Sequence, residues 1–162
     1  MALSGYNCRP PATMTIVPLT QERFDDFARL IEQLADYERL ERPDAAAMAR
    51  LRADAFASPP RFEAALALDE AQRPIAYAIW FETYSSFLAK PTMFLEDLFV
   101  LEHARRSGAG GKLFEFVRKL GEERGCGRMD WNVLDWNTPA RDFYHRRNAQ
   151  WMKEWLLYRL PY

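Results

Sequence analysis

Apolar residues recur at helical spacing in four segments of the sequence. The pattern predicts helices over residues 20–40, 43–57, 108–125 and 138–147. The first, with Thr20 as its expected N-cap, has one apolar face made of Phe24, Phe27, Ile31, Leu34 and Ala35. Gly125 and Asn148 follow the third and fourth helices, and both residue types tolerate the left-handed conformation that closes a helix.

Six shorter segments have the continuous or alternating apolar pattern of strands. They cover residues 14–19, 61–68, 74–84, 92–101, 128–136 and 151–160. The strands at 61–68 and 74–84 are joined by a short turn, whereas residues 92–136 have the order strand, loop, helix, strand. The pattern therefore predicts an α/β (α+β) fold, with a mixed and mostly antiparallel sheet flanked by about four helices.

The length and composition of the chain fit one globular domain. Its 162 residues are 49% apolar, which is enough to bury a core. We expect residues 1–12 to form a tail of variable order and residues 13–162 to form the domain. The net charge of −1 provides no field that would attract nucleic acid or an anionic membrane, and no apolar run reaches the ~20 residues of a transmembrane helix.

Cysteine and histidine residues are too few and too scattered to build a disulfide framework or a metal site. Cys8 and Cys126 lie far apart in the sequence, and the first 14 residues lack the charged and apolar regions of a signal peptide. His103 and His145 have no partner at metal-ligand spacing. We therefore expect a cytoplasmic protein with reduced thiols and no metal.

A glycine-rich loop, RRSGAGGKL, connects the strand at 92–101 to the third helix. Leu113 stands where a Walker loop requires serine or threonine and where the dinucleotide fingerprint requires its third glycine, so neither pattern fits. What remains is R-x-x-G-x-G over Arg105–Gly110. Its glycines let the backbone approach a ligand, and the helix N-terminus presents N–H groups to an anion. Taken alone, the loop fits a phosphate cradle and a solvent-exposed turn equally well.

A second motif favours the cradle. The sequence NTPARDFY contains Asn137, Ala140 and Tyr144 in the pattern N-x-x-A-x-x-x-Y, after the fifth predicted strand. Together and in this order, the two motifs resemble those of the GNAT N-acetyltransferase superfamily. The segments FLEDLFV, VLDWN and LADYE are similar to its diamine acetyltransferase branch, which includes spermidine/spermine and thialysine acetyltransferases. The resemblance, from about Met14 onward, implies the GNAT fold, acetyl-CoA as co-substrate and a homodimer.

The resemblance also implies which residues bind the cofactor. The backbone of Leu98, Phe99 and Val100 would pair with the pantetheine arm, and one N–H group of this strand would face the thioester carbonyl. Asn137 would cap its helix and bind a pantetheine amide. The pyrophosphate would lie against the loop residues Arg105, Arg106, Ser107, Gly108, Ala109, Gly110, Gly111 and Lys112.

Two adjacent acids, Glu96 and Asp97, lie inside an otherwise apolar strand, where unpaired carboxylates are costly to bury. Adjacent residues of a regular strand face opposite sides, so they form a pair only if a β-bulge re-aims one of them. The resemblance implies that Glu96 takes the amine proton through water and that Asp97 binds the cationic substrate; alternatively, either acid pairs with an arginine. By the same resemblance Tyr144 protonates the CoA thiolate, although the pattern alone also fits a core tyrosine.

The substrate-binding residues implied by the resemblance are Glu38, Asp97, Ser85 and Phe87. Ser85 and Phe87 stand where polyamine-acetylating members carry an acid and a tryptophan, which makes the chain more similar to the thialysine branch. We therefore expect an N-acetyltransferase acting on a primary amine of a small cationic substrate, either a diamine or polyamine or a thialysine- or lysine-like amine. The alternative is a non-catalytic acyl-CoA-binding module on the same fold, against which the presence of both Glu96 and Tyr144 argues.

Overall fold

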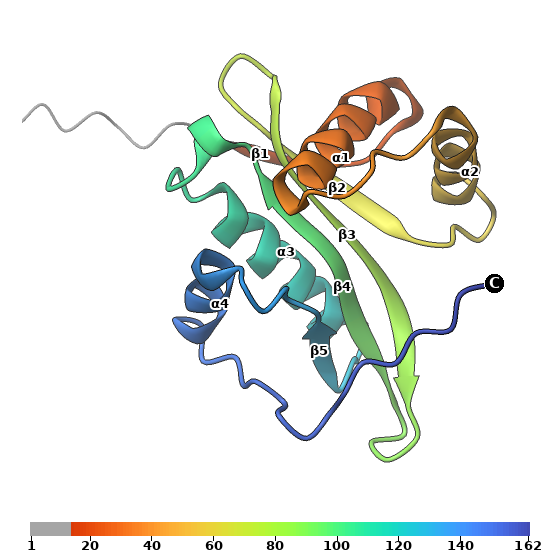
Figure 1. Ribbon diagram of the computed structural model, residues 1–162, viewed down its shortest axis with the longest axis vertical. Helices are drawn as coiled ribbons and strands as arrows, with labels where there is room; N and C mark the ends of the chain where they lie inside the picture. The colour runs from red at the N-terminus through yellow and green to blue at the C-terminus, as the bar shows by residue number, and fades with distance from the viewer. Residues whose placement is uncertain (1–13) are drawn as a thin grey trace, which may run out of the picture. The chain divides into compact units, whose positions relative to one another are not determined.

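The computed structural model describes residues 14–162, so the predicted tail and Cys8 lie outside the described residues. The chain divides into two compact units, one ending at Trp131 and the other covering Asn132–Tyr162. The first unit contains β1 (Thr15–Pro18), η1 (Gln21–Arg23), α1 (Phe24–Glu38), α2 (Ala45–Ala55), β2 (Glu63–Leu68), β3 (Pro74–Ser85), β4 (Lys90–Val100), η2 (Glu102–Ala104), α3 (Ala109–Glu123) and β5 (Arg128–Trp131). The second contains α4 (Thr138–His145) and an extended C-terminal segment (Figure 1).

Within the described residues, five strands form one sheet in the order β1-β2-β3-β4-β5. The strands from β1 to β4 pair antiparallel, and β5 pairs parallel to β4. The connection between β4 and β5 runs through α3, because parallel neighbours need a crossover rather than a tight turn. The predicted α/β fold with a mixed, mostly antiparallel sheet is therefore confirmed.

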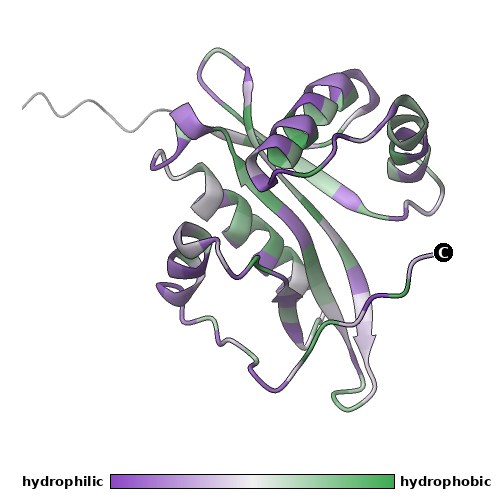
Figure 2. Ribbon diagram, in the orientation of Figure 1, coloured by the Kyte–Doolittle hydropathy of each residue, from purple (hydrophilic) through white to green (hydrophobic). Residues whose placement is uncertain are grey.

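Both faces of the sheet are covered by apolar side chains. On the face toward α1, the ring of Tyr77 in β3 packs edge-on against Phe27 at 5.3 Å between centroids. On the face toward α3, the ring of Trp80 in the same strand packs against Phe116 at 5.8 Å. Figure 2 shows the central strands largely hydrophobic, whereas the helices also carry hydrophilic residues. Residues 75–80 of β3 are all buried, so this strand is packed on both faces and holds the residues of the site on a rigid support.

The helix ends follow the sequence signals with one exception. Asp44 caps α2 by accepting a hydrogen bond from the N–H of Ala47 at 2.7 Å, and Gly125 and Asn148 have the predicted left-handed conformation, with φ of 73° and 61°. Thr20 makes no side-chain cap. The chain first forms the short η1 turn, and α1 begins only at Phe24.

The strand predicted over residues 151–160 is absent from the described chain, and β5 ends at Trp131 rather than near residue 136. A strand is stable only when a neighbour satisfies its backbone N–H and C=O groups. The apolar side chains of the final segment, including Trp155, Leu156 and Tyr158, are exposed instead.

Candidate active site

The two adjacent acids of β4 lie at a β-bulge. Ile79 of β3 pairs with Asp97 and Trp80 pairs with Leu95, so Glu96 is an extra residue in the ladder. A bulge of this kind re-aims a side chain away from the alternation of a regular strand. Glu96 and Asp97 consequently line the same pocket. The bulge is the feature that two adjacent acids of a strand need in order to act as a pair.

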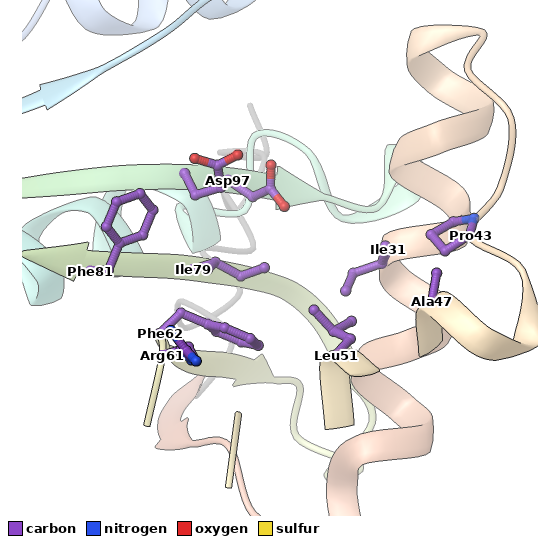
Figure 3. A pocket seen from close by; sticks show the side chains of 10 residues that line it. Ile31, Pro43, Ala47, Leu51, Arg61, Phe62, Ile79, Phe81 and Asp97 are labelled. Carbon is purple, nitrogen blue, oxygen red and sulfur yellow. The ribbon is translucent and has the colours of Figure 1, made fainter. Parts of the chain in front are cut away.

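The pocket beside these acids has a volume of about 450 Å³, within the range of small-molecule sites. Its walls come from α1, α2 and the sheet and are mostly apolar, formed by Ile31, Pro43, Ala47, Leu51, Phe62, Ile79 and Phe81. Figure 3 shows Asp97 on one side of this pocket, next to the side chains of Ile79 and Phe81. Apolar walls with carboxylates at one side suit a molecule that carries an amine on a hydrocarbon chain.

Tyr77 fixes the position of Asp97. Its hydroxyl donates a hydrogen bond to Asp97 Oδ2 at 3.2 Å, and its fully buried ring packs against Phe27 and Phe99. The apolar pattern of residues 74–84 marks Tyr77 only as a residue of the predicted strand. The signal that identifies it is the register, in which Tyr77 pairs with Phe99 and therefore shares a face with Asp97, two residues away.

Asp97 and Glu38 lie in an environment that favours their protonated forms. The pKa of Asp97 is raised to about 6, first by burial and next by the charge of Glu96; the hydrogen bond from Tyr77 lowers it, and Glu38 adds a further increase. Burial also raises the pKa of Glu38, which ends α1, and the pKa of the Tyr77 hydroxyl. A cation bound here would favour the ionised acids, and Asp97 can exchange a proton near neutral pH.

The strand that carries the acids continues past its neighbour. The ladder between β4 and β5 covers Thr92–Leu95, whereas the ladder between β4 and β3 continues to Val100. Leu98, Phe99 and Val100 therefore pair with β3 on one side and lie beyond the β5 ladder on the other. This is the stretch that was predicted to pair with the pantetheine arm.

The glycine loop is left-handed twice before α3, at Arg106 with φ of 66° and at Gly108 with φ of 93°. A Cβ placed on Gly108 would meet no protein atom within 4 Å, so the space beside this backbone is open. The Ser107 hydroxyl accepts a hydrogen bond from the N–H of Ala109 at 3.3 Å, and the first turn of α3 contains no acidic residue. The loop therefore leaves room and a favourable helix end for an anion.

The cationic side chains of the loop differ in what they contact. Arg105 donates from Nε to the carbonyl oxygen of Val100 at 3.3 Å, and its guanidinium lies 4.6 Å from the ring centroid of Tyr37. Arg106 and Lys112 are exposed. Arg105 thus ties the loop to the end of α1, and Arg106 and Lys112 have side chains that extend into solvent, where a phosphate group can reach them.

The second unit contains the other predicted motif. Asn137 caps α4, as predicted, by accepting a hydrogen bond from the N–H of Ala140 at 3.2 Å. Tyr144 is half-buried in the same helix, with its ring edge-on to Phe143 at 5.1 Å. Both residues of the motif thus have the local positions that the sequence implied, and their roles toward a cofactor stay predictions.

Ser85 and Phe87, by contrast, lie at the tip of the β3–β4 hairpin. Ser85 is buried, and its hydroxyl accepts a hydrogen bond from the N–H of Leu88 at 3.3 Å, whereas Phe87 is 97% exposed. Ser85 lies six positions after Ile79, the partner of Asp97, a distance of about 20 Å along a strand. The structure does not bring these two residues to the pocket acids.

The described residues give no sign of a metal centre or a membrane span. Among residues 14–162, no three histidine, cysteine, aspartate or glutamate side chains are placed so as to hold a metal ion. Within the same range, no helix is both long enough and apolar enough to cross a bilayer.

Known sequences resemble this chain over most of its length. The sequence profile of the Acetyltransferase (GNAT) family matches residues 25–149. A thialysine N-epsilon-acetyltransferase of Bos taurus is 33% identical over 136 residues, which cover 80% of this chain and 79% of that protein. An L-ornithine N5-acetyltransferase of Arabidopsis thaliana is 44% identical over 84 residues, which cover 52% of this chain and 37% of that protein.

Solved structures agree with the family match at the level of the fold. A probable acetyltransferase has a TM-score of 0.77 at 24% identity and covers 91% of this chain and 97% of its own. An aminoglycoside N-acetyltransferase in complex with CoA has a TM-score of 0.76 at 22% identity and covers 94% of this chain and 97% of its own. Together with the profile match, these likenesses show that the chain belongs to the GNAT family of acetyltransferases, as its two motifs predicted.

Proposed function

We propose that the protein transfers the acetyl group of acetyl-CoA to a primary amine of a small cationic substrate. The observation that carries this proposal is the β-bulge that brings Glu96 and Asp97 to one apolar pocket. An ammonium group must lose a proton before its nitrogen can attack a carbonyl carbon. Two carboxylates beside an apolar slot can hold the cation and accept that proton.

The residues of the chain fit acetyl-CoA, which supplies the acetyl group as a thioester. The backbone of Leu98, Phe99 and Val100 beyond the β5 ladder would bind the pantetheine amides, and Asn137 would contribute from α4. The pyrophosphate would lie at the N-terminus of α3 against Arg105, Arg106, Ser107, Gly108, Ala109, Gly110, Gly111 and Lys112. A backbone N–H directed at the thioester carbonyl can contribute about 3 kcal/mol to the rate.

We assign the amine proton to the carboxylate pair rather than to Glu96 alone. The charge of Glu96 raises the pKa of Asp97, and interacting carboxyls share their protons as a pair. Glu96 is exposed and can pass a proton to water, whereas Asp97 is half-buried and held by Tyr77. Asp97 and Glu38 would then bind the ammonium group, and Tyr144 would provide the proton that the departing thiol needs.

The acceptor is proposed to be a diamine or polyamine, or a thialysine- or lysine-like amine. The apolar pocket supports this range because it can surround a methylene chain that ends in an amine. The relatives named for thialysine and ornithine support its amino-acid members. A substrate role for Ser85 and Phe87 rests on the resemblance alone, since neither lines the pocket.

The test is thiol release from acetyl-CoA with a panel of polyamines, lysine analogues and aminoglycosides. We expect turnover with amines that combine a positive charge with a short apolar chain. Glu96→Gln and Asp97→Asn should each reduce turnover strongly while CoA still binds in calorimetric titrations. Binding of CoA without turnover of any amine would instead support a non-catalytic module.

We also propose a homodimer, a single domain over residues 13–162 and a location in the cytoplasm. The dimer is supported by the exposed apolar side chains of the final segment, Trp155, Leu156, Leu157, Tyr158 and Leu160, because such patches mark interaction sites. Light scattering should give twice the chain mass, and removal of the residues after Gln150 should give monomers. A full-length monomer would contradict this proposal.

The cytoplasmic location rests on the sparse cysteines of the sequence.

A further inference from the structure

The pocket has a second charged side that the proposed reaction does not use. Arg61 precedes β2 and lines the same pocket as Asp97. Figure 3 shows the two side chains on opposite sides, with Phe62 and Ile79 between them. Because β2 and β4 flank β3 in the sheet, their backbones lie about 10 Å apart. An extended small molecule can therefore contact both charged sides at once.

The side chain of Arg61 contributes little to the stability of the fold. Its side chain is 79% exposed, and its Nε lies 3.8 Å from Asp54 Oδ1, a geometry that contributes little to stability. Asp54 lies in α2 three residues after Leu51, which lines the pocket. The backbone N–H of Arg61 also donates to the carbonyl oxygen of Asp54 at 3.0 Å, so the two side chains are kept side by side.

A guanidinium next to a carboxylate matches the zwitterionic end of an amino acid. The guanidinium can donate two parallel hydrogen bonds to an α-carboxylate, and the carboxylate can accept from an α-ammonium group. Between this pair and the pocket acids the walls are apolar, as the methylene groups of a side chain require. The two sides together therefore describe a molecule with charged groups at both ends.

We propose that Arg61, with Asp54 beside it, binds the α-carboxylate and α-amino group of an amino-acid substrate whose side-chain amine reaches Glu96 and Asp97. This inference rests on the proposed function, because it assigns the far side of the same pocket. It makes Arg61 a specificity-determining residue. A diamine of the same length leaves the guanidinium facing a second positive charge, so the protein selects amino acids over diamines.

The test compares substrates that differ by the carboxyl group alone. Thiol release is measured with L-lysine and cadaverine and with L-ornithine and putrescine. The wild-type protein should show the higher kcat/KM for each amino acid. Arg61→Gln should raise KM for the amino acids about tenfold, the loss of a charged hydrogen bond, with kcat nearly unchanged and the diamine KM equal or lower. Arg61→Lys should keep part of the preference, and Asp54→Asn should lose less of it than Arg61→Gln.

A matched control is Arg73→Gln in the β2–β3 turn. Arg73 is 76% exposed and pairs with Asp69, but it does not line the pocket, so its loss should leave the preference unchanged. Lysinamide keeps the length of lysine without the carboxylate charge and should behave like cadaverine.

Each outcome separates the inference from the proposed function. If the protein acetylates amines but Arg61→Gln leaves the ratio of amino-acid to diamine kcat/KM unchanged, the inference is overturned and the proposed function stands. Equal use of lysine and lysinamide by the wild-type protein would also overturn it. If no amine is acetylated at all, the proposed function fails and the inference with it.

Discussion

Replacing Asp97 by asparagine should make the folded protein more stable at neutral pH while it removes activity. Asp97 is a half-buried carboxyl whose pKa is raised to about 6 by burial and by the charge of Glu96. Keeping it ionised in the folded state therefore opposes folding, and asparagine is neutral at every pH. The Tyr77 hydroxyl, which donates to Asp97, can donate equally well to the asparagine carbonyl.

The pKa fixes both the size and the sign of this effect. Raising the pKa from 3.8 to about 6 corresponds to about 3 kcal/mol of stability lost when the carboxyl ionises, at 1.36 kcal/mol per unit. Between pH 4 and 6 the folded state binds more protons than the unfolded state, so the wild-type protein loses stability as the pH rises. The new amide group offsets part of the gain, because its N–H groups need partners. We expect Asp97→Asn to gain about 1–2 kcal/mol above pH 7, or roughly 3–6 °C in Tm.

The assay is chemical denaturation of both proteins, followed by circular dichroism, from pH 4 to 8. The stability difference should be largest above pH 7 and should fall through pH 6. Near pH 4 it should have the opposite sign, because the wild-type carboxyl is then protonated in the folded state and mainly the cost of the amide group remains. Asp69→Asn provides a control of opposite sign. The backbone N–H groups of Arg73 and Ala71 donate to Asp69, and Arg73 holds its pKa below the usual value. Asp69→Asn should therefore be less stable than the wild-type protein above about pH 4, where the wild-type carboxyl is ionised and stabilises the fold.

The result that refutes the reasoning is an Asp97→Asn variant that is less stable than the wild-type protein by the same amount at every pH. A difference that does not depend on pH would show that Asp97 has the same pKa in the folded and unfolded states, and that the pocket is not a strained site for negative charge. Asp97 would then not have the near-neutral pKa that its proposed role as a proton acceptor requires.

Three further substitutions test other parts of the site. Gly108→Val should raise KM for acetyl-CoA far more than KM for the amine, because Gly108 is left-handed and a side chain there would occupy the open space beside the loop; an unchanged acetyl-CoA dependence in a folded variant would exclude a phosphate cradle. Glu38→Gln should raise KM for the amine and leave CoA affinity intact, as calorimetric titration with each ligand would show, whereas equal losses would indicate a structural role. Tyr144→Phe should lower kcat by about 10²–10⁴-fold if it is the general acid; full activity with a lower Tm would make it a packing residue.

The parts of the fold that local pattern determines were predicted well. The amphipathic repeat placed α1 to within a few residues, because its apolar stripe must face the sheet. Gly125 and Asn148 ended their helices as predicted, because few other residues adopt a left-handed conformation without strain. The prediction of a strand in the final segment was wrong. Its alternating apolar residues indicate a face that favours burial, but the pattern does not say whether a partner strand exists.

The site was predicted in its residue types more than in its geometry. Glu96 and Asp97 could be identified from the sequence because carboxylates inside an apolar strand are costly to bury without partners. The bulge that turns both toward one pocket depends on the pairing with β3, which no local pattern encodes. Tyr77 was missed for the same reason, since its relation to Asp97 exists only in the register of the two strands. Arg61 gave no signal beside its neighbouring prolines, because only the folded sheet places it near the pocket.

The bulge also changes which core each half of β4 serves. Before it, Met93 packs toward α3, where a Cβ on Gly121 would approach it to 3.2 Å; after it, Phe99 belongs to the cluster around α1. Both positions are odd-numbered and would face one side of an uninterrupted strand. Deleting Glu96 would remove the bulge and leave Leu95 opposite Trp80 and Asp97 opposite Ile79, so each half of the strand would keep the face it has now. The acids thus occupy the crossover between two hydrophobic cores, and the one extra residue is what lets a single strand contribute to both.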